Sequence, residues 1–243
     1  MIVLGFDTAT PATAVGLRLA DGTTLQAHDI PGDGERPGHA TRLLPLADQL
    51  LAQAGIDWGA LQRIAVGVGP GTFTGLRVGV ATARGLAQSL AIDLVGVSSL
   101  RALAHHALRE GSAGNLSSHG APSQPLPISV LAAIDARRGE VFAGGWSAEG
   151  ELFAARALAP ENLGDLLPHV ESWLAVGDGA VRYRSNFEGI GVEVPRTDSA
   201  LHCINGAAIC ELALHVEPTA PQAVLPDYLR RPDAEIALQG AAG

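Results

Sequence analysis

Lysine is missing from this sequence. All 16 positively charged side chains are arginines, and against 25 aspartates and glutamates they leave a net charge of -9. A protein that grips nucleic acid by itself normally offers a basic face, because its affinity comes largely from neutralised phosphates. We therefore expect any RNA contact to be supplied by a partner. The absence of lysine also excludes a lysine nucleophile and the lysine of a P-loop.

Cysteines and long apolar runs are equally scarce. Cys203 and Cys210 are the only cysteines, too few for a disulfide framework and not spaced as a CxxC pair, so we interpret them as small buried hydrophobes. No apolar run approaches the roughly 18 residues of a membrane-spanning helix. The N-terminus lacks a basic region followed by a cleavage site. We expect a cytoplasmic protein without membrane contact.

Aromatic residues make up only 4% of a chain that is 47% hydrophobic, which predicts a core of alanine, valine and leucine. A chain of 243 residues buries roughly three quarters of its unfolded surface. That is enough for one large domain or two intimate lobes.

Hydrophobic periodicity predicts an α/β chain in which one plan occurs twice. In the first half it predicts strands at 2–6, 14–19, 23–26, 63–67 and 94–97 and helices at 39–54, 73–90 and 98–108. In the second half it predicts strands at 128–135, 140–146 and 151–156, ending in helices. The predicted divisions are a first lobe at 1–110, a Gly/Ser/Pro-rich linker at 111–127, a degenerate second lobe at 128–220 and a tail at 221–243.

A glycine-rich turn, residues 69–79, runs from an apolar strand into a helix. The amides of such a turn, at the positive end of a helix, suit a phosphate, which makes Gly69 and Gly71 candidate contacts. The pattern fits neither G-x-G-x-x-G nor G-x-x-x-x-G-K-[ST]. The alternative is that the glycines only permit tight packing of strand against helix.

Three aspartates stand at similar places in the two halves. Asp7 ends the first strand and is followed by Thr8, so this pair could hold magnesium through water and bind phosphate; the alternative is an aspartate that caps a turn. Asp135 ends the first strand of the second half and is the symmetry-related candidate. Asp178, in Gly177-Asp178-Gly179, is a further candidate to lie near a nucleotide.

Small residues recur every four positions in the helix predicted at 73–90, at Gly75, Gly79, Ala83 and Ala87. Glycine costs about 1 kcal/mol inside a helix, so this stripe indicates that another backbone packs closely against it. The neighbour is either a helix of the same chain or a second protein. His39, which begins the helix at 39–54, is interpreted as a capping or surface residue, since no second histidine stands at helical spacing.

Several segments together resemble the TsaB family, also called YeaZ, the dimerisation subunit of the bacterial machinery that makes threonylcarbamoyladenosine in tRNA. The resemblance spans nearly the whole chain. It rests on Leu4-Gly5-Phe6-Asp7-Thr8-Ala9-Thr10, on His39 with Arg42-Leu43-Leu44-Pro45, on residues 69–79, on Gly96-Val97-Ser98-Ser99-Leu100, on Ile134-Asp135-Ala136-Arg137 with Gly139-Glu140-Val141, and on Tyr228-Leu229-Arg230.

This resemblance implies an actin-like ATPase (ASKHA) fold with two lobes, each a mixed central sheet flanked by helices. It implies a non-catalytic scaffold that pairs with a TsaD-type transferase through the first-lobe helices and helps recruit the TsaE ATPase. When the transferase is missing, homodimers through the same helices are expected. Contact with tRNA is expected only through the complex. ATP or ADP is expected only at the subunit junction, and no other cofactor is expected. The predicted partner contacts are Leu43, Leu46, Leu50, Gly75, Leu76, Gly79 and Ala83.

The TsaD family carries a Val-Asn-His-x-x-x-His segment whose two histidines bind the metal. Ser99 and Leu103 occupy those two places here, and no cysteine or carboxylate stands beside them in the sequence. Neither side chain replaces an imidazole, so the resemblance implies that the metal site is absent. The residues expected to remain from a nucleotide or phosphate site are Asp7, Thr8, Gly69, Gly71, Asp135 and Asp178.

Two other functions stay open as alternatives. An ATP-dependent small-molecule kinase of the same superfamily is motivated by Asp7, Asp135 and Asp178. Where such kinases place a phosphate-contacting turn, this chain has Arg137 and Arg138, whose bulk argues against close backbone approach but whose guanidinium groups could themselves bind phosphate. A metallopeptidase lacks ligands, since the sequence contains no H-E-x-x-H, and the absence of G-x-S-x-G leaves a serine hydrolase without its nucleophile motif.

Overall fold

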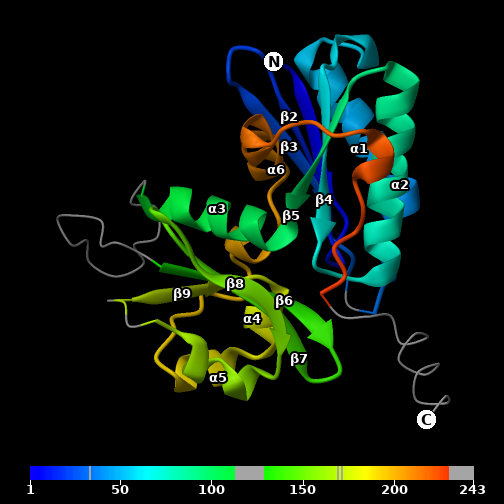
Figure 1. The fold of residues 1–243 in the computed structure, drawn as a ribbon. Helices are drawn as coiled ribbons and strands as arrows, with labels where there is room; N and C mark the ends of the chain where they lie inside the picture. The colour runs from blue at the N-terminus through cyan, green and yellow to red at the C-terminus, as the bar shows by residue number, and fades with distance from the viewer. Residues whose placement is uncertain (33, 113–128, 169, 171, 230–243) are drawn as a thin grey trace.

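The chain folds into two lobes, one above the other in Figure 1, each built around its own β-sheet. The computed structural model describes residues 1–32, 34–112, 129–168, 170 and 172–229. Both sheets are mixed and flanked by helices, which confirms the predicted fold class. Most of the predicted linker, from 113, and of the tail, from 230, lies outside the described residues. No helix among the described residues is long and apolar enough to cross a membrane.

The first sheet holds five strands in the order β3-β2-β1-β4-β5. Their bounds are β1 Val3–Asp7, β2 Thr13–Arg18, β3 Thr24–Asp29, β4 Arg63–Gly69 and β5 Asp93–Ser98. β1 pairs antiparallel with β2 and parallel with β4. β1 is buried along its whole length because it is central in the sheet and helices cover both faces. The carboxyl ends of β1 and β4 therefore meet at one edge, which faces the second lobe (Figure 1).

The second sheet repeats this plan with four strands in the order β8-β7-β6-β9. Their bounds are β6 Ser129–Arg137, β7 Glu140–Ser147, β8 Gly150–Leu158 and β9 Trp173–Val176. β6 pairs antiparallel with β7 and parallel with β9, as β1 does with β2 and β4. This shared order agrees with the predicted duplication. β9 was missed from the sequence because four residues are too few for alternation to show.

Helix α1, His39–Ala54, and helix α2, Phe73–Leu90, lie on one face of the first sheet (Figure 1). α1 buries the apolar stripe that predicted it, including Leu43 and Leu50, and runs through Pro45 without interruption. It ends at Gly55, whose φ of 68° is the left-handed conformation that glycine adopts most readily.

The small-residue stripe of α2 packs inside the chain. A Cβ on Gly75 would lie 1.9 Å from the carbonyl oxygen of Thr8, and one on Gly79 would lie 2.4 Å from the Thr8 hydroxyl oxygen. The close neighbour is therefore β1 and the loop that follows it, which is neither of the two alternatives considered from the sequence.

This packing corrects the prediction for six of the seven residues expected to contact a partner. These six residues are buried where the helices pack against their own sheet. The buried six are Leu43, Leu50, Gly75, Leu76, Gly79 and Ala83. Leu46 alone stays half-exposed. Amphipathic periodicity marks the face of a helix that is buried, but it does not say whether the covering surface belongs to the same chain.

Helix α3, Ser99–Ser112, lies between the two sheets and joins the lobes (Figure 1). Its apolar residues Leu100, Leu103 and Ala107 share one buried cluster with Val97 of β5 and Ile134 of β6. The space between the sheets is thus occupied at α3 by a continuous apolar core.

The last part of the predicted second lobe returns to the first. Helix α6, Gly206–Leu212, packs on β1 and β2, where Gly206 meets Gly16 backbone to backbone and Cys210 lies against Gly5. The predicted second lobe, 128–220, therefore includes a helix that packs with the first lobe, because α6 covers the face of the first sheet opposite α1 and α2. The return was invisible from sequence, since small residues permit close packing but do not identify the neighbour.

The remaining helical segments are short. They are α4 Asp178–Arg182, α5 Arg184–Gly189 and the 3-10 turns Trp58–Ala60, Pro160–Asn162, Gly164–Leu166, Ala200–His202, Ala213–His215 and Pro221–Ala223.

Two glycines of α2 offer a matched test of the internal packing. We expect Gly75→Ala to lower the free energy of unfolding by about 2 kcal/mol, because its methyl group would overlap the Thr8 carbonyl. Gly85 is exposed with open space around its Cβ position, so Gly85→Ala should raise stability by about 0.5 to 1 kcal/mol through helix propensity. Urea denaturation measures both; equal effects would contradict the packing described.

Candidate functional site

Asp7 is the most deeply buried carboxyl group at the junction of the lobes, with 1% of its surface exposed. Its Oδ1 accepts a hydrogen bond from the Ala9 amide at 2.6 Å, and its Oδ2 accepts one from the Ser99 hydroxyl at 2.5 Å. Gly67 lies against it, and a Cβ there would come within 1.7 Å of Oδ2. Asp7 thus caps the turn after β1, as the alternative interpretation proposed, and both of its oxygens are committed inside the chain.

Burial raises the pKa of Asp7 to about 6 from its ordinary 3.8, because the carboxylate loses its hydration. The hydrogen bonds from Ser99 and Ala9 act in the opposite direction, since they stabilise the charged form. Desolvation is the larger effect. A carboxyl group enclosed in this way has no open side from which to hold a hydrated magnesium ion.

The glycine-rich turn packs directly on the loop after Asp7. The Thr8 hydroxyl donates to the Gly75 carbonyl at 2.7 Å, and the Thr72 amide donates to the Ala9 carbonyl at 2.8 Å. A Cβ on Gly71 would lie 2.4 Å from that same carbonyl oxygen. A Cβ on Gly69 would lie 2.8 Å from the Asp227 carbonyl oxygen. The glycines singled out as phosphate contacts are therefore packed against backbone of the same chain, as the tight-packing alternative requires.

Asp135 is the counterpart of Asp7 in the second lobe, at the bulged end of β6. Its Oδ1 accepts from the Arg137 amide at 2.9 Å. Its Oδ2 lies 3.2 Å from Arg137 Nη1 and 3.4 Å from Arg182 Nη1. Both oxygens are again committed, here to an ion-paired cluster that holds the β6–β7 hairpin.

That hairpin carries three consecutive left-handed residues, Arg137 with φ 63°, Arg138 with φ 55° and Gly139 with φ 82°. A two-residue turn with positive φ at both positions matches the twist of paired strands, which accounts for Arg138 and Gly139. Arg137 is unfavourable in this conformation, and its two bonds to Asp135 compensate for it.

Asp178, a candidate to lie near a nucleotide, is hydrogen-bonded to Asp135 near the end of β6. Its Oδ1 accepts from the Asp135 amide at 3.0 Å. Desolvation raises the pKa of Asp178, the backbone bond from Asp135 lowers it, and the negative charge of Asp135 raises it further. Gly177 and Gly179 pack so tightly on Ala133 that a Cβ at either would clash with its carbonyl group.

Ser99 and Leu103 lie one turn apart on α3 at the lobe junction. No carboxylate is near Ser99 in the sequence, but the fold brings Asp7 to it, and Ser99 donates a hydrogen bond to that carboxylate. Leu103 is fully buried, and its Cδ1 lies 3.2 Å from where a Cβ on Gly177 would be. Among the described residues no group of three or more His, Cys, Asp or Glu is placed to hold a metal ion.

His39 is not the surface residue expected from the sequence. It is buried, and its Nδ1 lies 2.9 Å from the Thr13 hydroxyl of β2. Burial lowers the pKa of His39, while nearby Asp29 raises it. His39 therefore fastens the start of α1 to the first sheet.

The outward sides of α1 and α2 carry exposed apolar residues. Leu44 is 42% exposed and Phe73 is 40% exposed, and Leu46 is half-exposed between the buried positions of α1. We call the surface that contains Leu44, Leu46 and Phe73 the docking face. Exposed apolar side chains that form one patch commonly mark a contact surface, and these three residues are the candidates for one on α1 and α2.

Sequence reasoning missed several residues of the lobe junction. These residues include Gly67, Arg182 and His202, which lie 60, 47 and 25 positions from their partners Asp7, Asp135 and Gly177 and belong to no recognisable motif. His202 is buried, and its Nδ1 accepts a hydrogen bond from the Gly177 amide at 3.2 Å. Only the strand-end position of Asp7 gave a usable signal, because carboxyl ends of parallel strands meet at one edge.

Titration of Asp7 provides a test of its enclosure. Because its pKa is higher in the folded state, the folded protein binds more protons between about pH 4 and 6, so its stability falls as pH rises through that range. Asp7→Asn removes this titration. The free energy of unfolding of the Asp7→Asn variant minus that of the natural protein should therefore increase by about 3 kcal/mol between pH 4 and pH 7. Denaturation curves at several pH values measure this; the exposed Asp57→Asn serves as control, and parallel curves for all three proteins would contradict it.

Known proteins resemble this chain in sequence and in fold. A family model described as TsaD, tRNA N6-adenosine threonylcarbamoyltransferase, matches residues 33–178. The tRNA threonylcarbamoyladenosine biosynthesis protein TsaB of Escherichia coli is 34% identical over 186 residues, which cover 74% of this chain and 72% of that protein.

Solved structures extend the likeness to almost the whole chain. YeaZ from Pseudomonas aeruginosa superposes with a TM-score of 0.72 at 28% identity, over 93% of this chain and 100% of that one. The ethanolamine utilization protein EutJ from Carboxydothermus hydrogenoformans shares the fold alone, with a TM-score of 0.50 and 11% identity over 86% of this chain and 90% of that one. Because sequence identity and near-complete superposition coincide, the chain belongs to the TsaB (YeaZ) family, with the two-lobed, actin-like fold.

Proposed function

We propose that this protein is a non-catalytic subunit in the formation of threonylcarbamoyladenosine in tRNAs that read codons starting with A. It binds and activates a TsaD-type transferase and helps that pair recruit a TsaE-type ATPase. The family membership supports the pathway. The observation that carries the non-catalytic role is that both oxygens of Asp7 and of Asp135 are bonded within the chain.

The docking face is the surface on which we place the transferase. Six of the seven residues first expected there are buried, so the proposed contacts are the seventh, Leu46, together with Leu44 and Phe73. Two helices with exposed apolar side chains suit pairing with two similar helices of a partner. The same surface accounts for a homodimer when the transferase is missing, because one apolar patch serves either partner.

The remaining roles follow from the chemistry of the chain. With a net charge of -9, it reaches tRNA through the complex rather than by itself, and it acts in the cytoplasm. Any ATP or ADP lies at the junction with the transferase, and no metal or other cofactor belongs to this subunit alone.

Association with the transferase is the first test. Leu44→Asp places a charge in the centre of the docking face, and we expect the dissociation constant of the complex with the TsaD-type transferase of the same organism to rise by roughly tenfold or more. Folding should be unaffected because Leu44 is exposed. Ile190→Asp, at a position 37% exposed in the second lobe, is the matched control. Light scattering and calorimetry measure binding, and unchanged affinity of the Leu44 variant would reject this face.

Nucleotide binding separates this function from a small-molecule kinase. A kinase binds magnesium-ATP without a partner, whereas the oxygens of Asp7 and Asp135 are committed to bonds within this chain. We expect calorimetric titration of the isolated protein with magnesium-ATP to give no saturable heat. Micromolar binding would restore the kinase alternative.

A further inference from the structure

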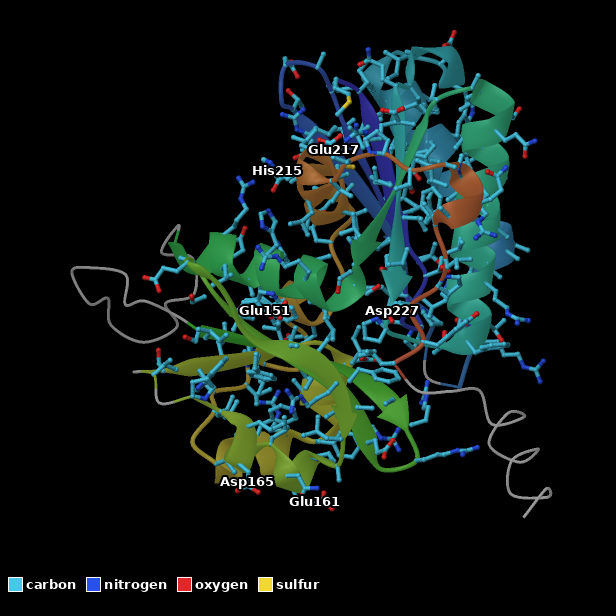
Figure 2. All side chains as sticks on the ribbon, viewed as in Figure 1. Glu151, Glu161, Asp165, His215, Glu217 and Asp227 are labelled. Carbon is cyan, nitrogen blue, oxygen red and sulfur yellow. The ribbon has the colours of Figure 1, made fainter. Side chains whose placement is uncertain are left out.

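The segment after α6 crosses the first lobe as an extended strap, which we define as residues 219–228. Figure 1 shows it running alongside α2 toward the lobe junction, and Figure 2 places Asp227 near that junction. The Thr219 amide donates to the Leu94 carbonyl of edge strand β5 at 3.4 Å, and the Asp227 amide donates to the Val68 carbonyl at 2.7 Å. The strap therefore covers backbone that would otherwise form an open sheet edge.

Arg84 of α2 fastens the middle of the strap. Its Nε donates to the Val224 carbonyl at 3.0 Å, and its Nη2 donates to the Gln222 carbonyl at 3.1 Å. The side chain of Val224, whose carbonyl accepts one of these bonds, belongs to the buried core of the first lobe. A charged donor gives stronger hydrogen bonds than a neutral one, so a single side chain determines how the strap sits against α2.

The end of the strap meets the first turn of α2. The rings of Tyr228 and Phe73 have centroids 5.2 Å apart, and the Arg77 guanidinium lies 3.9 Å from the Phe73 ring centroid. Arg77 Nε also lies 3.4 Å from the Tyr228 hydroxyl. Phe73, which belongs to the docking face, is thus held in place by the strap.

The strap also presents an apolar residue of its own. Leu225 follows the anchored Val224 and is 62% exposed. Of the six exposed large hydrophobic residues among the described part of the chain, Leu44, Phe73 and Leu225 come from α1, α2 and the strap. The strap and the docking face are linked directly by the contact between the Tyr228 and Phe73 rings.

We propose that the strap is part of the docking face, that Leu225 contacts the partner and that Arg84 is a positioning residue. The partner is the TsaD-type transferase, so this inference rests on the proposed function. The transferase family model matches residues 33–178, which include α1 and α2 but not the strap. The strap therefore lies outside the part of this chain that resembles the transferase, and its contacts would be specific to this subunit's side of the pairing.

Two variants test the strap, with the full-length chain in each case. Arg84→Gln should speed hydrogen exchange at the Thr219 and Asp227 amides and raise the dissociation constant for the transferase, each by roughly tenfold. Leu225→Ser should leave exchange unchanged but weaken transferase binding by about fivefold to tenfold, because it removes only an exposed contact. Arg156→Gln, an exposed arginine with one 3.5 Å bond to a neighbouring carbonyl, is the control and should alter neither.

The outcomes separate the two proposals. If the natural protein binds the transferase and Leu225→Ser binds equally well, the strap lies outside the docking face and this inference is overturned while the proposed function stands. If Leu225→Ser weakens only self-association, the occupant is a second copy and the inference is again overturned. Unchanged exchange in Arg84→Gln would reject the positioning role. If the natural protein does not bind the transferase, the proposed function fails first, and exchange still reports whether Arg84 anchors the strap.

Discussion

The hydrogen bond from Ser99 to Asp7 is the contact on which the architecture of the lobe junction depends. It joins the carboxyl end of the central strand β1 to the first residue of α3, the helix that lies between the two sheets. Polar groups buried at this depth are costly unless every one of them is bonded. Asp7 meets that requirement with Ser99 and Ala9, and Gly67 leaves it the space. The strand, the helix and the second lobe are thereby held in one arrangement.

The same satisfaction of buried polar groups supports the proposal that this two-lobed fold is a non-catalytic subunit. At each strand end where such a fold offers a carboxylate, this chain satisfies that carboxylate itself, with a hydroxyl in the first lobe and two guanidinium groups in the second. The surface that we propose for partner binding is then outside the junction. It lies on the outward sides of α1 and α2, beside the strap that Arg84 fastens.

Much of the fold was predictable because local patterns are strong in this chain. Alternation and helical spacing predicted α1 and α2 at their observed bounds, and the strand-end position of Asp7 predicted its place at the junction. The buried faces of both helices were also predicted correctly as apolar stripes. Their assignment to a partner was wrong, because a stripe that packs on Thr8 of the same chain has the same spacing as one that packs on another protein.

The sequence by itself determined the two-lobed α/β plan and the TsaB-type motifs, since hydrophobic period and glycine placement act over a few residues. Only the tertiary structure decided that Ser99 bonds Asp7, that Arg182 reaches Asp135, and that α6 and the strap return to the first lobe. These contacts join residues 47 to more than 100 positions apart in the chain, and no local preference encodes such a distance. They arise because each buried polar group must find a partner and each sheet face must be covered.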